Sequence, residues 1–280
     1  MIIQHNLQAL NAVYNLKKND YGMGKAIEKL SSGLRINSAA DDAAGLAISE
    51  KMRSQIRGME MAKRNAADGI SLIQTAEGAM SSMHSILQRM NELCVQAANG
   101  TYSDDDREKI SLELSSLADE IDTEVENTQY NNMNLFMGPN APITFQIGAN
   151  QGQVLDLTID KTNLPQSMAL FGSAYLFGNV HVDLSDPANA GIVLDNVKGY
   201  IDSVSTERSN LGAVQNRLEH TINCLGVYSE NLTAAESRIR DMDMASGMME
   251  FVKYQILNQS TSAMLAQANQ VPQGVLSLLR

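Results

Sequence analysis

The strongest constraint on this fold is a heptad repeat in the C-terminal third of the chain. An apolar residue recurs at every seventh position over six heptads: Val197, Val204, Leu211, Leu218, Leu225, Leu232 and Ile239. Such a seam is typical of a coiled-coil helix, and a helix over residues 190–240 is about 75 Å long at about 1.5 Å per residue. A helix of that length needs partner helices, because its apolar seam is otherwise left in water.

Prolines limit where the partner helices can lie, because proline removes a backbone hydrogen bond and clashes with the preceding helical turn. Four of the five prolines fall within residues 139–187, and only Pro272 lies outside. Residues 1–138 and 188–271 are therefore free of proline. We predict a mainly α fold, a long helical coiled-coil or bundle rod built from both chain ends, with a small β-hairpin region in the centre.

The N-terminal flank provides two partner helices. Apolar residues between 73 and 97 occupy two complementary heptad positions. After a break at residues 99–101, Ser103 precedes three aspartates, which is typical of an N-cap followed by an acidic first turn. The apolar spacing of residues 110–125 predicts a second helix, ending near Asn131. We expect the two helices to form an antiparallel hairpin, with the long C-terminal helix lying along both.

A β-hairpin is predicted between the helical flanks. Residues 143–147 and 155–159 alternate apolar and polar side chains, and the intervening sequence from Gly148 to Gly152 is typical of a turn. Residues 160–187 show no clear period, and we interpret them as irregular structure with one more short strand.

Both chain ends carry more apolar residues than a solvent-exposed tail normally has. Near the N-terminus these lie on one helical face, and near the C-terminus they extend from residue 251 to residue 279. Periodicity leaves two arrangements open: one closed bundle completed by the two ends, or burial against neighbouring molecules. The candidate assembly residues are Ile3, Leu7, Leu10, Tyr14, Leu257, Met264, Leu265, Val271, Val275, Leu278 and Leu279.

Composition argues against several classes of function. The net charge of −11, with only 21 Lys and Arg, disfavours nucleic acid as a partner. No stretch approaches the roughly 18 apolar residues of a membrane span, and the N-terminus lacks the pattern of a cleaved signal peptide. The histidines are scattered, and Cys94 and Cys224 form no CxxC motif, so we expect no enzyme activity, metal or cofactor. Both cysteines are interpreted as small core residues.

Three stretches resemble the bacterial flagellins: residues 30–48 (LSSGLRINSAADDAAGLAI), residues 87–101 and residues 265–280. Residues 146–150 and 237–241 extend this similarity. The resemblance implies a structural subunit of the flagellar filament, outside the cell, in which paired terminal helices line a hollow core. It also implies export, unfolded, through the secretion channel of the flagellum. The extreme ends would be disordered in the monomer and fold on polymerisation.

The resemblance suggests a division into three parts. Residues 1–44 and 241–280 form the terminal filament-core domain, and residues 45–138 and 188–240 form the helical bundle domain. Residues 139–187 are a small insert in place of the large outer domains of many flagellins. Asp41 and Asp42 lie in a polar turn that resembles a spoke joining the terminal helix to the bundle.

Flagellins similar to this chain use the second stretch for packing between protofilaments and for recognition by an animal Toll-like receptor. The positions that match the receptor contacts are Arg89, Leu93, Gln96 and, on the following helix, Glu113. Gln88 and Glu92 complete the candidate receptor and protofilament interface. Two departures, Asn91 and Leu117, stand where many members have basic residues, which leaves the strength of receptor binding open.

The implied partners are other copies of the chain, the filament cap, the junction protein and a cytoplasmic export chaperone. Two alternatives are a hook–filament junction protein and a secreted coiled-coil interaction protein. The match at residues 87–101 and at the C-terminus favours flagellin over both.

Overall fold

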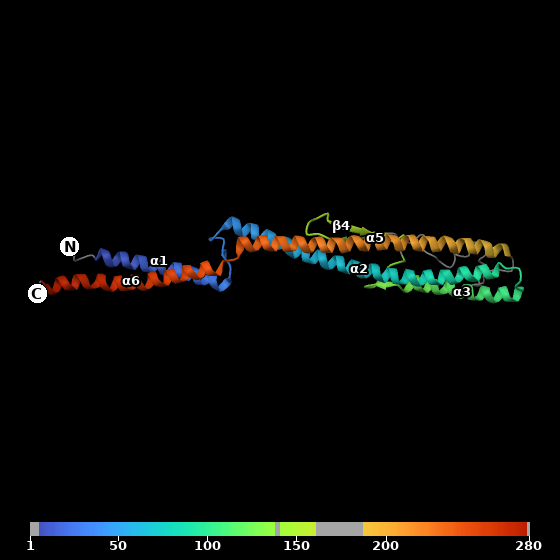
Figure 1. Cartoon of the computed structure of the whole chain (residues 1–280), viewed down its shortest axis with the longest axis horizontal. Coiled ribbons are helices and arrows are strands. Elements are labelled where there is room, and N and C mark those ends of the chain that lie inside the picture. The colour runs from blue at the N-terminus through green and yellow to red at the C-terminus, as the bar shows by residue number, and fades with distance from the viewer. Residues whose placement is uncertain (1–5, 138–140, 161–186, 279–280) are drawn as a thin grey trace. The chain divides into compact units, whose positions relative to one another are not determined.

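The computed structural model describes residues 6–137, 141–160 and 187–278, with only the backbone for residues 187–189 and 271–278. These residues form long helices and two small hairpins, which confirms the predicted mainly α fold with a small central β region (Figure 1). The helices are α1 (Leu7–Ser32), α2 (Ala43–Ala97), α3 (Asp104–Asn127), α5 (Pro187–Arg240) and α6 (Met244–Leu278). None of the described helices is long and apolar enough to cross a membrane.

The chain packs as two units, one made of residues 1–56 and 230–280 and the other of residues 57–229. Helices α2 and α5 contribute residues to both. The domain boundaries predicted near residues 44 and 241 separate a filament core from a helical bundle, and they stay a prediction.

The unit of residues 57–229 is built around the predicted heptad seams. Val197, Leu211 and Leu218 of α5 are fully buried in one cluster with Met80 and Leu87 of α2. Helix α3 adds a third apolar face to this cluster, as expected for a helical bundle. The pairing of α2, α3 and α5 predicted from sequence is therefore confirmed.

The two cysteines differ in their surroundings. Cys94 is buried in the same cluster, where burial raises the pKa of its thiol to about 12. A thiol that stays protonated is a poor nucleophile, so Cys94 acts as a small apolar core residue. Cys224 is exposed, and its assignment as a core residue was wrong because it lies off the apolar seam of α5.

Ser103 is the N-cap of α3, as predicted, and it forms a capping box with Asp106. The Ser103 hydroxyl accepts a hydrogen bond from the Asp106 backbone N–H at 3.3 Å, and the Asp106 carboxylate accepts one from the Ser103 N–H at 3.4 Å. The two side chains thereby satisfy backbone donors that have no partner within the helix.

The end of α3 differs from the prediction. The helix stops at Asn127, and the chain turns through the hairpin of β1 (Gln129–Tyr130) and β2 (Met133–Asn134). The loop residues Asn131 and Asn132 have φ angles of 49° and 62°. A two-residue hairpin loop of this kind requires positive φ at both positions, which asparagine tolerates better than most residues.

The predicted central hairpin is confirmed as β3 (Ile143–Gln146) paired antiparallel with β4 (Val154–Leu157). The Gln146 side chain donates hydrogen bonds to the carbonyls of Gly148 and Asn150, which closes the loop. Asn65 of α2 donates to the Gln146 carbonyl at 3.0 Å and holds the hairpin on the helix. The further strand expected within residues 160–187 lies outside the described residues, apart from Asp160 and Pro187.

Truncating a seam residue tests this packing. Because Leu211 is fully buried, Leu211→Ala should lower the free energy of unfolding by about 2–5 kcal/mol through lost apolar burial and a residual cavity. The control Leu112→Ala, at an exposed position of α3, should change it by less than about 0.5 kcal/mol. Urea unfolding followed by circular dichroism measures both, and equal losses would contradict the assignment of the core.

Candidate assembly site on the terminal helices

Helices α1 and α6 lie side by side and antiparallel, with the start of α1 and the end of α6 at the same end of the pair (Figure 1). Polar side chains join them at intervals. The Asn6 side chain donates to the Ala268 carbonyl at 2.8 Å, and the Asn19 side chain donates to the Thr261 hydroxyl at 3.1 Å. Asn258 donates to Asp20. Such polar pairs fix the register of two helices, since any other register leaves them unmatched.

The seam between α1 and α6 is narrow. Its members alternate at spacings of three and four residues: Ala9, Ala12, Leu16, Asn19, Met23, Ala26 and Leu30 on α1, and Gly247, Phe251, Tyr254, Asn258, Thr261, Leu265 and Ala268 on α6. Many are small or polar, and among them only Ala26, Gly247 and Ala268 are buried. At Gly22 a Cβ atom would lie 2.5 Å from the Tyr254 ring, so glycine permits this close approach.

A second apolar face lies on the opposite side of each helix. On α1, Leu10 and Tyr14 are 69% and 70% exposed, and on α6, Met249 and Ile256 are 69% and 60% exposed. Because a helix turns about 100° per residue, these residues point away from the shared seam. The pairing of α1 with α6 therefore leaves both outer faces open, which favours burial against neighbouring molecules over one closed bundle.

The candidate assembly residues fall into three groups. Leu7, Leu10, Tyr14, Leu257 and Met264 are exposed, whereas Leu265 is half-buried in the seam and serves pairing within the chain. Val271, Val275 and Leu278 belong to α6, where only the backbone is described, and Ile3 and Leu279 lie outside the described residues.

Met249, Val252 and Ile256 are not among the assembly residues predicted from the sequence. Their spacing of three and four residues on α6 was a readable signal.

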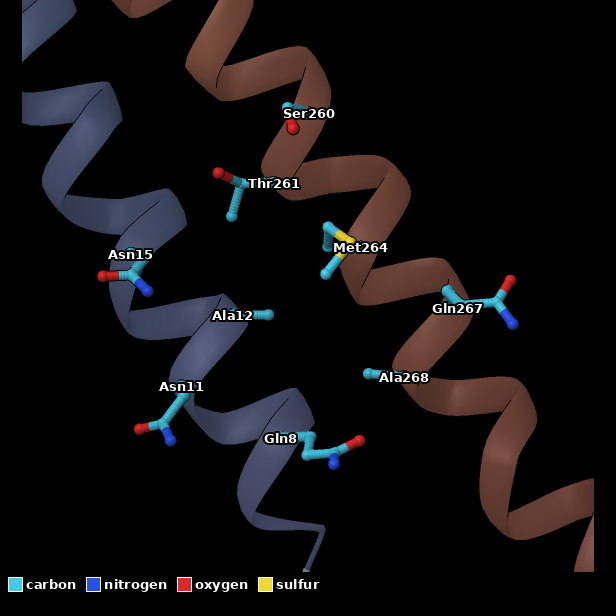
Figure 2. A pocket seen from close by; sticks show the side chains of 9 residues that line it. All are labelled: Gln8, Asn11, Ala12, Asn15, Ser260, Thr261, Met264, Gln267 and Ala268. Carbon is cyan, nitrogen blue, oxygen red and sulfur yellow. The ribbon is translucent and has the colours of Figure 1, made fainter.

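A groove of about 490 Å³ runs between α1 and α6, lined by side chains that carry no charge (Figure 2). They are amides, hydroxyls, alanines and one methionine: Gln8, Asn11, Ala12, Asn15, Ser260, Thr261, Met264, Gln267 and Ala268. Residues 1–16 and 254–279 contain no Asp, Glu, Lys or Arg. Covering these parts of the chain with another subunit therefore requires no charged side chain to lose its hydration.

The chain leaves α1 through a tightly held turn. Gly33 ends the helix in the left-handed conformation with φ of 71°, which glycine adopts without strain. The Arg35 N–H then donates to the Arg240 carbonyl at 2.7 Å, and the Met242 N–H donates to the Gly33 carbonyl at 2.9 Å. The end of α1 is thus fixed to the link between α5 and α6.

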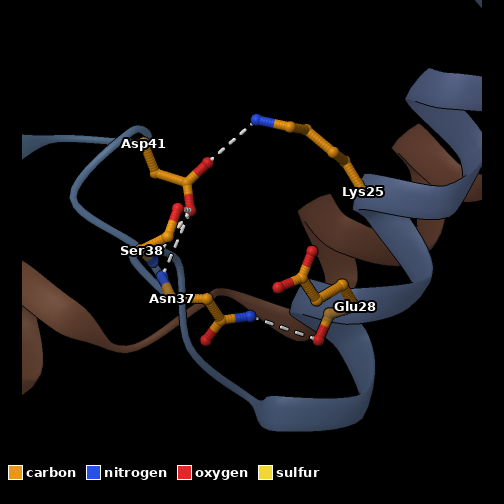
Figure 3. A network of polar contacts seen from close by, with 5 residues as sticks. All are labelled: Lys25, Glu28, Asn37, Ser38 and Asp41. Carbon is orange, nitrogen blue, oxygen red and sulfur yellow. Dashed lines mark hydrogen bonds and ion pairs between the residues drawn. The ribbon is translucent and has the colours of Figure 1, made fainter.

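Asp41 organises the loop between α1 and α2 (Figure 3). Its carboxylate accepts hydrogen bonds from the Lys25 ammonium at 3.2 Å, from the backbone N–H groups of Asn37 and Ser38, and from the Ser38 hydroxyl. The Lys25 hydrogen bond and the Ser38 N–H lower the pKa of this carboxyl to about 2. Asp42 accepts from the Gly45 N–H at 2.9 Å and caps α2. These contacts account for the two aspartates of the predicted polar turn.

The residues matched to receptor recognition lie in the other unit. Arg89 of α2 donates to Glu113 of α3 at 2.8 Å and to Glu92 at 3.3 Å, so it joins the two helices on the surface. Gln88, Glu92, Gln96 and Glu113 are also exposed. Leu93 is only 2% exposed and belongs to the core, which corrects its place in the set, since a buried side chain offers no contact to a partner.

Comparisons with known proteins cover nearly the whole chain. Residues 3–141 match the bacterial flagellin N-terminal helical region, and residues 194–279 match the bacterial flagellin C-terminal helical region. A flagellin of Halalkalibacterium halodurans is 52% identical over 280 residues, and one of Bacillus subtilis is 49% identical over 304 residues, each alignment covering 100% of both chains.

A solved structure, the putative flagellar hook-associated protein from Vibrio parahaemolyticus, matches with a TM-score of 0.62. The match covers 72% of this chain and 100% of that one. At 15% identity it shows a likeness of fold alone.

The Asp41 network predicts a specific pH dependence. Because the pKa of Asp41 in the folded chain lies below its usual value of about 3.9, its stabilising effect is complete above that value and is lost as pH falls towards about 2. NMR of the Asp41 carboxyl carbon as a function of pH should therefore give a titration midpoint of about 2. Lys25→Met should raise that midpoint while the backbone hydrogen bonds persist. A wild-type midpoint near the usual value would contradict the network.

Proposed function

Because this chain belongs to the bacterial flagellin family, it is a structural subunit of the flagellar filament, and we propose that copies polymerise through the outer faces of α1 and α6. Flagellins are structural proteins, and the filament they build lies outside the cell and serves motility. The full-length likeness to flagellins also favours this role over a hook–filament junction protein or a secreted coiled-coil interaction protein.

This proposal rests on the exposed apolar residues of α1 and α6 that lie opposite the seam between the two helices. Removing one Leu or Ile side chain from water contributes about 1.5–3 kcal/mol, so Leu10 and Ile256 together offer several kcal/mol per subunit before the costs of association. A filament also needs contacts between two different surfaces, because such contacts propagate without closing. The outer faces of α1 and α6 are two such surfaces.

The proposed assembly also agrees with the division of the chain into a filament core, a shell and an insert. Residues 1–44 and 241–280 form the filament core, residues 45–138 and 188–240 form the surrounding shell, and residues 139–187 remain a small insert. The narrow α1–α6 seam supports this assignment, since a pair of helices with so few buried residues gains stability from neighbours.

Other partners complete the proposal. The free subunit has an exposed apolar surface on α6, which an export chaperone would cover before passage through the flagellar secretion apparatus. In the assembled flagellum the subunit would also contact the filament cap and the junction protein. These partners come from the family resemblance, and the exposed face of α6 supports the chaperone in particular.

Polar substitutions on the outer faces test the assembly role. Leu10→Gln and Ile256→Gln should each raise the critical concentration for polymerisation at least roughly tenfold, which corresponds to about 1.4 kcal/mol. The control Gln255→Ala, at an exposed neighbouring position of α6, should assemble as the wild type does. Seeded elongation followed by sedimentation and electron microscopy gives the critical concentrations. Wild-type assembly by both glutamine variants would refute the proposal.

A second proposed role is recognition by an animal Toll-like receptor through the surface of Gln88, Arg89, Glu92, Gln96 and Glu113. Arg89 is central because it contacts both acidic residues of this surface. Arginine at the centre of an interface contributes both charge and a planar group that forms several hydrogen bonds.

Charge reversal at Arg89 tests receptor recognition. Arg89→Glu should require a roughly tenfold higher concentration of purified monomer for half-maximal signalling, since it places three carboxylates together and removes the cation. The control Lys109→Glu reverses the charge of an exposed residue on α3 and should leave signalling unchanged. Equal signalling by the Arg89 variant and the wild-type monomer would sink the assignment.

A further inference from the structure

Helix α6 carries methionines that are exposed to solvent. Met249 lies at the centre of its outer face beside Val252 and Ile256, and Met248 lies at one edge. Met264 is also exposed and lines the groove between α1 and α6. Met80, Met83 and Met90, by contrast, are fully buried in the core of residues 57–229. Because methionine oxidation depends on access of the oxidant to sulfur, the chain contains both reactive and protected methionines.

We propose that this face of α6, together with Met264 in the adjoining groove, is a modification site, at which oxidation of Met248, Met249 and Met264 to methionine sulfoxide stops the free subunit from polymerising. The proposal rests on the assembly role of α6 argued above, with a second copy of the chain as the occupant of this face. It adds a chemical control that acts before assembly.

The oxidant is a peroxide, with hydrogen peroxide as the simplest case. The thioether sulfur attacks one peroxide oxygen, the O–O bond breaks, and a sulfur–oxygen bond forms. The sulfur loses two electrons, and the second oxygen leaves as water with both peroxide protons. The products are methionine sulfoxide and water, and methionine sulfoxide reductases reverse the change.

The effect on assembly follows from the surroundings of Met249. A sulfoxide is a strong hydrogen-bond acceptor, and Val252 and Ile256, which continue the apolar face, have no side-chain donor. The ammonium of Lys253, one turn after Met249, lies over the Tyr254 ring at 6.0 Å from its centroid. Covering this face with a second copy would bury the new oxygen without a partner, which is unfavourable. In a filament the same packing would exclude peroxide, so the modification would act on subunits that have not yet assembled.

Limited oxidation of the purified monomer tests the proposal. Peptide mass mapping should show Met249, Met248 and Met264 oxidised before Met80, Met83 and Met90. The critical concentration of the oxidised chain should rise at least tenfold, and treatment with both classes of methionine sulfoxide reductase should restore it. The triple variant Met248→Leu, Met249→Leu, Met264→Leu is compared with its own untreated form, and peroxide should not raise its critical concentration.

Three outcomes would overturn the account, and they are distinguishable. Unchanged polymerisation of the oxidised wild-type chain would refute the redox control alone, as would loss of assembly in the peroxide-treated triple variant. Equal oxidation rates of Met249 in filaments and in monomers would show that the outer face of α6 stays open, which contradicts the proposed function itself. Recovery of the critical concentration after reductase treatment is measured on the wild-type chain, so it does not depend on whether the triple variant folds.

Discussion

The antiparallel pairing of α1 with α6 through a narrow seam is the interaction on which the behaviour of the chain ends depends. The seam uses Ala26, Gly247 and Ala268 where large apolar residues would make a stronger pair, and it sets its register by polar contacts such as Asn19 to Thr261. Exposed apolar side chains such as Leu10, Tyr14 and Ile256 are left on the outer faces. The two helices therefore bury few residues between them and present apolar faces on which further helices can pack.

The unit of residues 57–229 follows a different physical principle. Its seams consist of Leu, Val, Ile and Met side chains that are buried within one chain, and its surface pairs such as Arg89 with Glu113 join neighbouring helices. This unit is stabilised without a second copy. In the proposed assembly, therefore, only the ends of the chain have to change their surroundings.

Much of this organisation was predictable from sequence because it depends on local patterns. The repeat of Val197 to Ile239 predicted α5, Ser103 with its aspartates predicted the start of α3, and alternation predicted β3 and β4. The hairpin at Asn131 and Asn132 was missed because its strands, β1 and β2, are only two residues long and show no alternation of apolar and polar residues.

The candidate site was less predictable for a physical reason. Each terminal helix has two apolar faces, and periodicity alone does not show which face pairs within the chain. Leu265 was assigned to assembly although it packs in the seam, whereas Met249 lies outside and was not assigned. Leu93 illustrates the same difficulty on α2, since one step around a helix separates a surface residue from a core residue.

Electron cryomicroscopy of the polymerised filament, at a level of detail that shows side chains, tests the central claim most directly. The account predicts that Leu10, Tyr14, Met249 and Ile256 are covered by neighbouring subunits while the α1–α6 seam persists within each chain. A filament in which these four side chains face water, with subunits joined through other surfaces, would contradict it.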